Sequence, residues 1–301
     1  MAASAREFFL GVDGGATRCR ARLRDASGRV RAEIEGPAAN IYVDFDRAIA
    51  VVRDVVLGAL TKAGLATGES ERVALGLGLA GLSSEREAAR IVAALPGWAR
   101  VETVNDAIAA CLGAHAGADG GLIIAGTGSA AAARVKGRDT IIGGRGFLLG
   151  DDGAAARIGA DALRAALRAH DGLQASTPLT RALMAHFSDD PLAMLQWALT
   201  AKPSDYGAFA PQTLKAAAEG DVTALPIVDA AARALAALAE ALEALGAPRL
   251  VMVGGLAEPI KPHLPSALAV KLLEPLFDAT DGAILAVGGV LPGASDRRRL
   301  A

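Results

Sequence analysis

The sequence predicts an α/β protein built from two related lobes, and three observations lead to this fold class. Apolar runs of strand length alternate with amphipathic stretches of helix length. Three strands in a row open the chain, and the same opening begins again near residue 120. Hydrophobic residues make up 52% of the chain and charged residues 21%, which is typical of a globular protein. Because a repeated order indicates two related lobes that face a cleft, we expect a boundary near 113–118, which divides the chain into 1–115 and 116–301.

The first lobe is expected to begin with three antiparallel strands. The apolar run 8–12 ends in Asp-Gly-Gly, the alternating run 19–23 follows, and a turn at 26–28 leads into a third strand through residue 34. The elements expected next, in chain order, are an amphipathic helix over 44–62, a buried strand over 73–79, a helix from about 84 and a strand that ends at 104.

The second lobe repeats this opening and then becomes mainly helical. An apolar strand, a glycine turn and a second apolar strand predict another hairpin. The expected elements, in order, are strands over 122–125, 130–135 and 140–142, a glycine-broken loop to 153, a helix from about 152, further helices to 245, and a strand over 250–253 that ends in two glycines.

Charge and cysteine content exclude several classes of protein. The net charge of −2 and the pI near 6.1 predict no basic face for nucleic acid. We expect Cys19 and Cys111 to be reduced packing residues, because their spacing fits neither a disulfide framework nor a metal site. The three arginines at 297–299 are expected to form a solvated tail.

Neither a secretion signal nor a membrane span is expected. The chain opens without a basic segment followed by an apolar one. The longest weakly charged stretch, 107–133, is broken by repeated glycines and is interpreted as helix, loop and buried strand. We therefore expect a cytoplasmic protein with no membrane partner.

Two glycine turns that follow strands are candidates for phosphate binding. Gly14 and Gly15 allow the backbone to present N–H groups to an anion, and Thr17 adds a hydroxyl donor. The neighbouring Asp13 suits a Mg2+ ion held through water, because hard cations prefer carboxylate oxygen. An ordinary hairpin turn at this Asp-Gly pair is the alternative.

The second turn follows the next buried strand. Gly126, Thr127, Gly128 and Ser129 make a compact phosphate cradle that contains no lysine, although an ordinary turn again remains the alternative. Two such turns, together with Gly254 and Gly255 after a later strand, indicate a nucleotide held from both sides.

Candidates for the chemistry itself lie between and after these turns. Asp106 follows a strand, where its carboxylate is able to accept the proton of an attacking hydroxyl, or simply to cap a helix together with Asn105. Asp151, in the glycine-rich loop 143–153, is a candidate acceptor for sugar hydroxyls, or an N-cap in a flexible loop. Asn40 is a similar candidate in a loop after Gly36-Pro37, with a surface turn as its alternative.

With these residues assembled, the sequence resembles the N-acetylglucosamine kinase and glucosamine kinase group of the BadF/BadG/BcrA/BcrD ATPase family, which belongs to the actin-like ATPase superfamily. Five motifs carry the resemblance in the family's order. They are 11–17 and 122–129 for phosphate, 104–107 and 281–286 as connecting segments, and 250–255 for adenosine.

The resemblance implies two actin-like (ribonuclease H-like) lobes with ATP and Mg2+ in the cleft between them, and a homodimer. It also implies an ATP-dependent kinase acting on the 6-hydroxyl of N-acetylglucosamine, with Asp106 as the catalytic base. Asn40, Gly81, Gly144 and Asp151 would contact the sugar. Thr17 and Thr127 would meet phosphate oxygens, and the segment at Gly207-Ala208 would approach the adenine.

One residue departs from the family pattern. Arg145 stands where relatives usually carry a tryptophan that covers the sugar near its amine or acetamide group. A guanidinium still stacks or donates hydrogen bonds, but it repels a protonated amine. This favours a neutral N-acetyl sugar, with glucosamine as the alternative substrate.

Two other functions are open on this fold. The activator ATPases of the family hold an iron–sulfur cluster with cysteines, and Cys19 and Cys111 do not supply that set. A non-catalytic sugar sensor is the other alternative, because a fold alone does not give a function. Asp13, Asp106 and Thr127 together favour the enzyme, since a sensor needs no general base.

Overall fold

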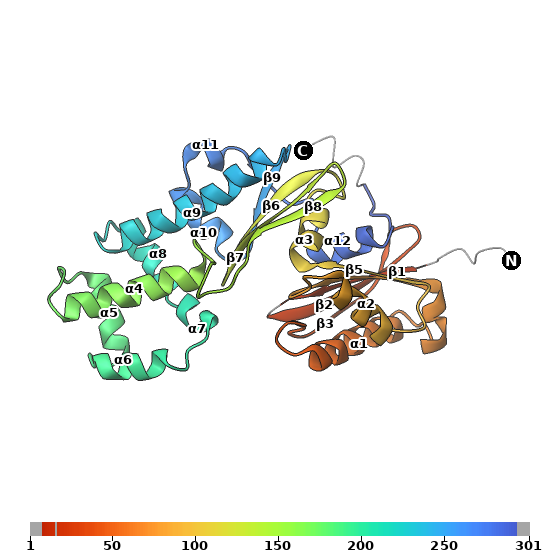
Figure 1. Ribbon diagram of the computed structural model, residues 1–301, viewed down its shortest axis with the longest axis horizontal. Helices are drawn as coiled ribbons and strands as arrows, with labels where there is room; N and C mark the ends of the chain where they lie inside the picture. The colour runs from red at the N-terminus through yellow and green to blue at the C-terminus, as the bar shows by residue number, and fades with distance from the viewer. Residues whose placement is uncertain (1–7, 16, 294–301) are drawn as a thin grey trace. The chain divides into compact units, whose positions relative to one another are not determined.

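The computed structural model describes residues 8–15 and 17–293, which group into two compact units (Figure 1). The first unit consists of the described residues up to Leu122, Ala132–Thr140 and those from Leu273 onward, and the second of Ile123–Ala131 and Ile141–Leu272. The expected arginine tail at 297–299 lies outside the described residues. The single boundary after residue 115 stays a prediction, and the described residues from Leu273 onward belong to the first unit.

The first sheet has five strands in the order β3-β2-β1-β4-β5. Their bounds are β1 Phe8–Gly14, β2 Arg18–Asp25, β3 Val30–Pro37, β4 Val73–Leu79 and β5 Arg100–Asn105. The predicted opening of three antiparallel strands is confirmed, because β1 pairs antiparallel with β2 and β2 with β3. β4 and β5 extend the sheet with parallel pairing.

Helices cover both faces of this sheet (Figure 1). They are α1 Phe45–Lys62, the 3-10 helix η1 Thr67–Arg72, α2 Glu85–Ala94, α3 Asp106–Ala114 and α12 Ala279–Ala286. Asp44, Ser84 and Asn105 cap α1, α2 and α3 through their side chains, at the starts that the sequence predicts. Apolar residues of α1 and α2 form one core with one face of the sheet, and the buried Cys19 belongs to it.

Glycines bring α12 and α3 unusually close to the opposite face. A Cβ at Gly11 would lie 2.1 Å from the carbonyl oxygen of Thr280, and one at Gly76 would lie 1.9 Å from that of Ala283. A Cβ at Gly282 of α12 would lie 1.7 Å from the carbonyl oxygen of Ala109 in α3. Only residues without a side chain permit these backbones to touch, so the two helices lie directly on the sheet and on each other.

The second sheet repeats the order of the first. Its order is β10-β9-β6-β7-β8. In both sheets, three consecutive strands lie side by side, and two later strands extend the sheet next to the first of them. The bounds are β6 Gly120–Ala125, β7 Ser129–Val135, β8 Arg138–Gly143, β9 Leu250–Val253 and β10 Leu272–Leu273. The predicted duplication is therefore visible in the strand order, although the two-residue β10 has no signal in the sequence.

Helices make up most of the second unit. They are α4 Ala155–His170, α5 Pro178–His186, α6 Pro191–Ala198, α7 Pro203–Gly207, α8 Ala210–Ala218, α9 Ala224–Ala244, α10 Ala257–Ile260, the 3-10 helix η2 Lys261–His263 and α11 Ser266–Ala269. A helix does begin close to the expected start near Asp152, because α4 starts at Ala155. The alternative in which an aspartate caps it is wrong, because Ala154 is the N-cap and makes no side-chain cap bond. Among the described residues, none of the helices is long and apolar enough to cross a membrane.

The close packing of α12 predicts a sharp difference between two glycines of the first unit. Gly76→Ala is expected to lower the free energy of unfolding by about 3 kcal/mol, because its methyl group would overlap the backbone of α12. Gly68→Ala is the control, since a Cβ there meets nothing within 4 Å, and we expect a change of about 0.5 kcal/mol or less. Urea unfolding measures both variants, and equal stabilities would contradict the packing argument.

Candidate active site

The carboxyl ends of three parallel strands meet at one edge of the first sheet. Gly14 of β1 pairs in register with Leu79 of β4, and Leu79 with Asn105 of β5. The loop after β4 returns to β1, because the Ala80 N–H donates to the Gly14 carbonyl at 2.8 Å. Ligand sites in open α/β sheets lie at such an edge, so this is where the candidate residues of the first unit converge.

Asn40 and Gly81 lie against each other at this edge. The Asn40 Oδ1 accepts a hydrogen bond from the Tyr42 N–H at 2.9 Å and lies 2.8 Å from the position a Cβ would take at Gly81. Gly81 has a φ of +89°, which few other residues adopt. A backbone bond from Ile41 to the Ala80 carbonyl, at 3.1 Å, holds the two loops together.

Asp106 is the first residue of α3 and lies beside these loops. The Asn105 side chain ties the start of α3 to the β4–α2 loop by donating to the Leu82 carbonyl at 3.0 Å. The Asp106 carboxylate accepts the Ala107 N–H at 2.9 Å. Burial, assisted by the negative charge of Asp13, raises the pKa of Asp106 to about 6. The predicted helix cap and the predicted general base are thus compatible, because Asn105 is the cap.

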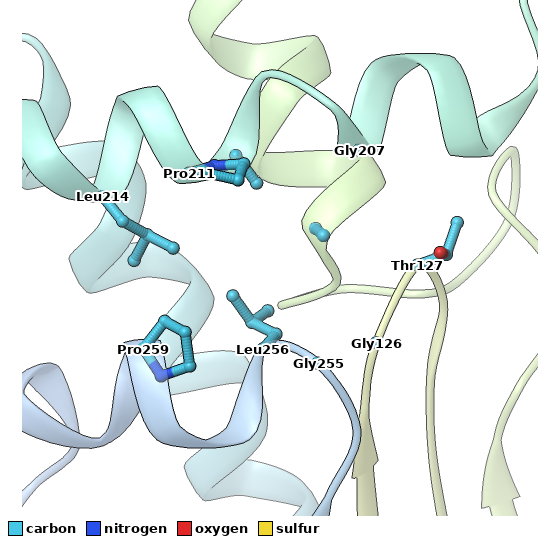
Figure 2. A pocket seen from close by; sticks show the side chains of 10 residues that line it. Gly126, Thr127, Gly207, Pro211, Leu214, Gly255, Leu256 and Pro259 are labelled. Carbon is cyan, nitrogen blue, oxygen red and sulfur yellow. The ribbon is translucent and has the colours of Figure 1, made fainter.

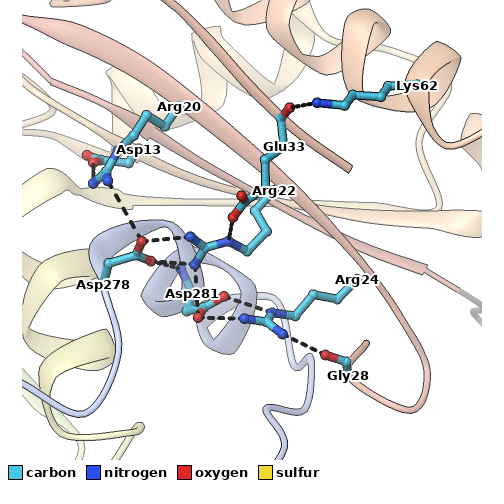
Figure 3. Close-up of polar contacts among 9 residues, drawn as sticks. All are labelled: Asp13, Arg20, Arg22, Arg24, Gly28, Glu33, Lys62, Asp278 and Asp281. Atoms are coloured by element: carbon cyan, nitrogen blue, oxygen red, sulfur yellow. Dashed lines mark hydrogen bonds and ion pairs between the residues drawn. The ribbon is translucent and has the colours of Figure 1, made fainter. Parts of the chain in front are cut away.

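Asp13 of β1 is held by an arginine of the neighbouring strand. The Arg20 Nη2 donates to the Asp13 Oδ2 at 2.9 Å, and the same guanidinium lies 3.8 Å from Asp278 (Figure 3). Asp13 is partly buried, with 17% of its side chain exposed. One edge of this carboxylate is therefore fixed, and its charge acts on Asp106.

The same ion network anchors α12 to β2. Alternate residues of a strand point to one face, so Arg20, Arg22 and Arg24 all face α12. Arg22 binds Asp278 through two bonds of 2.8 and 2.9 Å, and Arg24 binds the buried Asp281 through two bonds of 2.9 and 2.8 Å (Figure 3). Bidentate pairs of this kind fix geometry as well as charge. The alternating arginines of β2 were the available sequence signal for this network, and our sequence analysis missed it.

The carboxylate of Asp13 fits a metal ion that takes most of its other ligands from water and from a bound nucleotide. In the described ranges 8–15 and 17–293, no group of three or more histidines, cysteines, aspartates or glutamates is placed to hold a metal ion. Mg2+ usually keeps several waters and takes one or two carboxylates together with nucleotide phosphates. Asp13 is a carboxylate suited to that arrangement.

In the second unit, hydrogen bonds connect the end of β6 and the turn that follows it to the start of α4 and to the segment after β9. The Ala155 N–H at the start of α4 donates to the Gly126 carbonyl at 2.9 Å. Gly254, with a φ of +110°, brings the end of β9 against Ala125, whose carbonyl accepts the Leu256 N–H at 2.9 Å. The two predicted nucleotide turns of this unit, 126–129 and 254–255, are thus neighbours.

Several donors of the predicted phosphate turns are already engaged. The Gly15 N–H donates to Arg18 and the Gly126 N–H to Gly128, both at 3.0 Å. The Ser129 hydroxyl is buried and donates to the Asp152 carbonyl at 2.7 Å. Thr17 is exposed on the other turn.

The Asp151 side chain lies against the predicted phosphate turn 126–129. Its Oδ2 is 2.9 Å from the position a Cβ would take at Gly128, and the Ser129 N–H donates to its carboxylate. Its φ of +57° is uncommon for a residue other than glycine. Burial raises the pKa of Asp151. In the same loop, the Gly144 N–H donates a hydrogen bond to the Ser129 carbonyl at 3.1 Å, and the Arg145 side chain is exposed.

An aromatic contact anchors this loop to the helices. The Arg157 Nη2 donates to the Phe147 carbonyl at 2.8 Å, and its guanidinium lies 5.3 Å from the centre of the Phe147 ring. The same ring lies 5.1 Å from the ring of Tyr206 in α7. The candidate sugar loop is therefore connected to α7, which leads into the wall of a pocket.

That pocket lies wholly in the second unit and has a volume of about 510 Å3 (Figure 2). Its lining residues are Gly126, Thr127, Ala155, Gly207, Ala210, Pro211, Leu214, Gly255, Leu256 and Pro259. The predicted turns contribute Gly126, Thr127 and Gly255, whereas Ala208 and Gly254 are not among the lining residues. The apolar wall from α8 and α10 was missed, because its alanines, prolines and leucines look like ordinary helix residues in the sequence.

The candidate residues thus form two groups, one in each unit. Asp13, Asn40, Gly81 and Asp106 gather at the edge of the first sheet, and the turns at 126 and 254 gather with Asp151 in the second unit. Two five-stranded sheets of the same order, each ending in glycine turns, define the class of actin-like ATPase folds. A ROK hexokinase from Thermus thermophilus shares this fold at a TM-score of 0.53 and 19% identity, over 93% of this chain and 98% of the hexokinase.

The chain belongs to the BadF/BadG/BcrA/BcrD ATPase family, whose model matches residues 10–275. It is 34% identical to glucosamine kinase GspK of Vibrio cholerae, over 93% of this chain and 96% of that protein. It is 30% identical to N-acetyl-D-glucosamine kinase of Dictyostelium discoideum, over 89% and 91%. A crystal structure from Chromobacterium violaceum, named as a candidate N-acetylglucosamine kinase, has a TM-score of 0.86 at 31% identity, over 93% and 99%. The family expected from the sequence is confirmed.

The raised pKa of Asp106 predicts that this residue destabilises the fold at neutral pH. The folded pKa of about 6 exceeds the ordinary value of 3.8, so the stability that protonation provides is present in acid and is lost as the pH rises through 6. Asp106→Asn is expected to raise the free energy of unfolding at pH 7.5 by on the order of 2 kcal/mol, and by less at pH 5.

Urea unfolding of wild type and variant at the two pH values measures this difference. Asp46→Asn is the matched control, because Asp46 also lies in the first turn of a helix but is 95% exposed. A gain for Asp106→Asn that is the same at both pH values would contradict the assignment.

Proposed function

We propose that this protein is an ATP-dependent amino-sugar kinase that transfers the γ-phosphoryl group of ATP to the 6-hydroxyl of N-acetylglucosamine. The observation that carries the proposal is the partly buried Asp106 carboxylate, whose pKa is raised to about 6 at the edge it shares with Asn40 and Gly81. A base with a pKa near the working pH is what proton removal from a sugar hydroxyl requires. The relatives named as glucosamine and N-acetylglucosamine kinases support the same reaction.

In this proposal ATP occupies the pocket of the second unit. Its apolar walls suit an adenosine group, and the adjacent turn supports the phosphates. The N–H groups of Gly15, Gly126 and Ser129 are engaged within the protein. We therefore assign the phosphate contacts chiefly to the hydroxyls of Thr17 and Thr127 and to the Thr127 and Gly128 amides, with Gly14 and Gly254 shaping the turns.

Asp13 is the proposed contact for Mg2+, through water. When bound, the ion would neutralise charge on the phosphates. Arg20 keeps the Asp13 carboxylate in one orientation and leaves its other oxygen free of that bond.

Asp106 then accepts the proton of the 6-hydroxyl as that oxygen attacks the γ-phosphoryl group in line, and ADP and a sugar 6-phosphate leave. Asn40, Gly81, Gly144 and Asp151 are the proposed sugar contacts. We assign Arg145, exposed in the same loop as Asp151, to the substituent at carbon 2, because it stands where relatives usually carry the tryptophan that covers this part of the sugar. The protein would act in the cytoplasm as a homodimer.

Glucosamine is the second candidate acceptor, and the 34% identity to a glucosamine kinase favours it. The guanidinium of Arg145 argues against it, because it would repel the protonated amine of glucosamine. The neutral acetamide of N-acetylglucosamine meets no such repulsion, so we propose it as the preferred substrate.

The role of Asp106 predicts a large loss of turnover with retained folding. Asp106→Asn is expected to lower kcat by roughly 100- to 10,000-fold, because the amide accepts no proton. In the wild type, kcat/KM for the sugar should fall about tenfold per pH unit below 6 and level off above it, since only the carboxylate form acts as base. ADP release coupled to a dehydrogenase measures both, with Asp46→Asn as control. Near-normal turnover by Asp106→Asn would refute the assignment.

Arg145 predicts the choice between the two amino sugars. The wild type, assayed with ATP and Mg2+ across N-acetylglucosamine, glucosamine, glucose, N-acetylmannosamine and N-acetylmuramic acid, should release ADP fastest with N-acetylglucosamine. Arg145→Trp should shift the ratio of kcat/KM toward glucosamine by roughly tenfold, because one like-charge contact is removed. Equal turnover of both sugars by the wild type, unchanged in the variant, would exclude this role. If none of the sugars stimulates ADP release, the proposed kinase activity is refuted.

A further inference from the structure

The pocket of the second unit has a chemical character that bears on which nucleotides it accepts. Nine of its ten lining residues are glycine, alanine, proline or leucine, and Thr127 is the tenth (Figure 2). Figure 2 shows Pro211 and Leu214 of α8 on one side and Leu256 and Pro259 on the other, with Thr127 at the turn. The polar side chain therefore lies where phosphates are proposed to bind, and the far walls are apolar.

Three polar side chains on the surrounding helices have partners outside the pocket. The Thr213 hydroxyl of α8 is fully buried and donates to the Phe209 carbonyl at 2.9 Å. The Tyr206 hydroxyl of α7 donates to the Ala198 carbonyl at 3.3 Å. Lys215, one residue beyond Leu214, is 77% exposed and lies 3.8 Å from Glu219. None of these three side chains lines the pocket.

The backbone of the walls offers few donors as well. Pro211 and Pro259 have no N–H group. The Leu256 N–H is bonded to the Ala125 carbonyl at 2.9 Å. The purine ring of a nucleotide in this pocket would consequently be held by apolar contacts with its faces more than by hydrogen bonds to its edges.

Adenine and guanine differ in the groups that such contacts do not read. Adenine carries an amino donor at carbon 6, whereas guanine carries an oxygen acceptor there and an amino donor at carbon 2. A site built to hydrogen-bond one group rejects an analogue without it by roughly 10,000-fold or more, but an apolar pocket discriminates between close analogues by only about 100-fold. The two purines have nearly the same apolar faces.

We propose that this site accepts purine nucleoside triphosphates as a class, so that GTP and ITP serve as phosphoryl donors beside ATP. The inference rests on the proposed kinase function and deepens it by naming the donor class. The triphosphate is identical in all three, so the turns would hold the same reacting group, and Asp106 would accept the proton of the same sugar hydroxyl with each donor. Acceptor choice would then be strict, and donor choice permissive.

The test compares kcat/KM for ATP, GTP and ITP at saturating amino sugar, with the sugar 6-phosphate as the product measured. We expect the three values to lie within about 100-fold of one another. A preference for ATP greater than that would overturn the inference, because it would require a hydrogen-bonding element that reads the base. Calorimetric binding of the β,γ-imido analogues of ATP and GTP is measured in parallel.

The binding measurement separates this inference from the proposed function. If no donor supports phosphoryl transfer but the two analogues bind with dissociation constants within about 100-fold, the kinase proposal fails and the pocket assignment stands. If ATP is turned over but the GTP analogue binds more than about 100-fold weaker, only the donor inference fails.

A substitution in the apolar wall of the pocket tests whether apolar contact is the reason for the permissive choice of donor. Leu214→Ala is expected to raise the KM for ATP and for GTP by the same factor, within about threefold, because both bases lose the same apolar contact. Thermal unfolding and an unchanged KM for the sugar confirm that the variant is intact. A loss confined to ATP would show selective recognition at this wall and would overturn the proposal.

Discussion

The direct contact between α12 and the first sheet is the constraint on which much of the site depends. Without side chains at Gly11 and Gly76, the helix backbone reaches van der Waals contact with β1 and β4. At that distance Asp278 and Asp281 reach the arginines of β2, and their bidentate pairs fix the helix along the sheet. Arg20, in the same row, then holds Asp13. A segment that follows β10 late in the chain thereby orients a carboxylate near its beginning.

The same contact explains why Asp106 has the environment of a base. α12 lies on α3 where Gly282 meets the Ala109 backbone, so the first turn of α3 is held between helix and sheet. Burial there disfavours the charged carboxylate and raises its pKa to about 6. We therefore expect the fold to be less stable at neutral pH than it would be with a neutral residue at position 106.

The sequence was most informative where local chemistry decides the structure. Caps at Asp44, Ser84 and Asn105 and the hairpin turns follow short-range rules, so these elements and the duplicated order were predictable. The N-cap of α4 was not, because Ala154 caps the helix without a side-chain bond. The ion network and the pocket walls join residues far apart in the chain. The position of Asp151 against the turn 126–129 likewise depends on a backbone conformation that no residue pattern predicts.

The proposed sugar contacts are mainly polar and come from both units, whereas the pocket of the second unit is mainly apolar. Two candidate groups of the first unit have fixed partners: the Asn40 amide oxygen accepts the Tyr42 N–H, and the Asp106 carboxylate accepts the Ala107 N–H. A sugar displays several hydroxyls, and a site with buried hydrogen-bonding groups rejects sugars that leave them unpaired. The pocket of the second unit presents alanine, leucine and proline, which stack on any flat ring of suitable size. Because discrimination follows from unpaired polar groups and not from apolar area, the selectivity of the proposed kinase would reside in its acceptor residues.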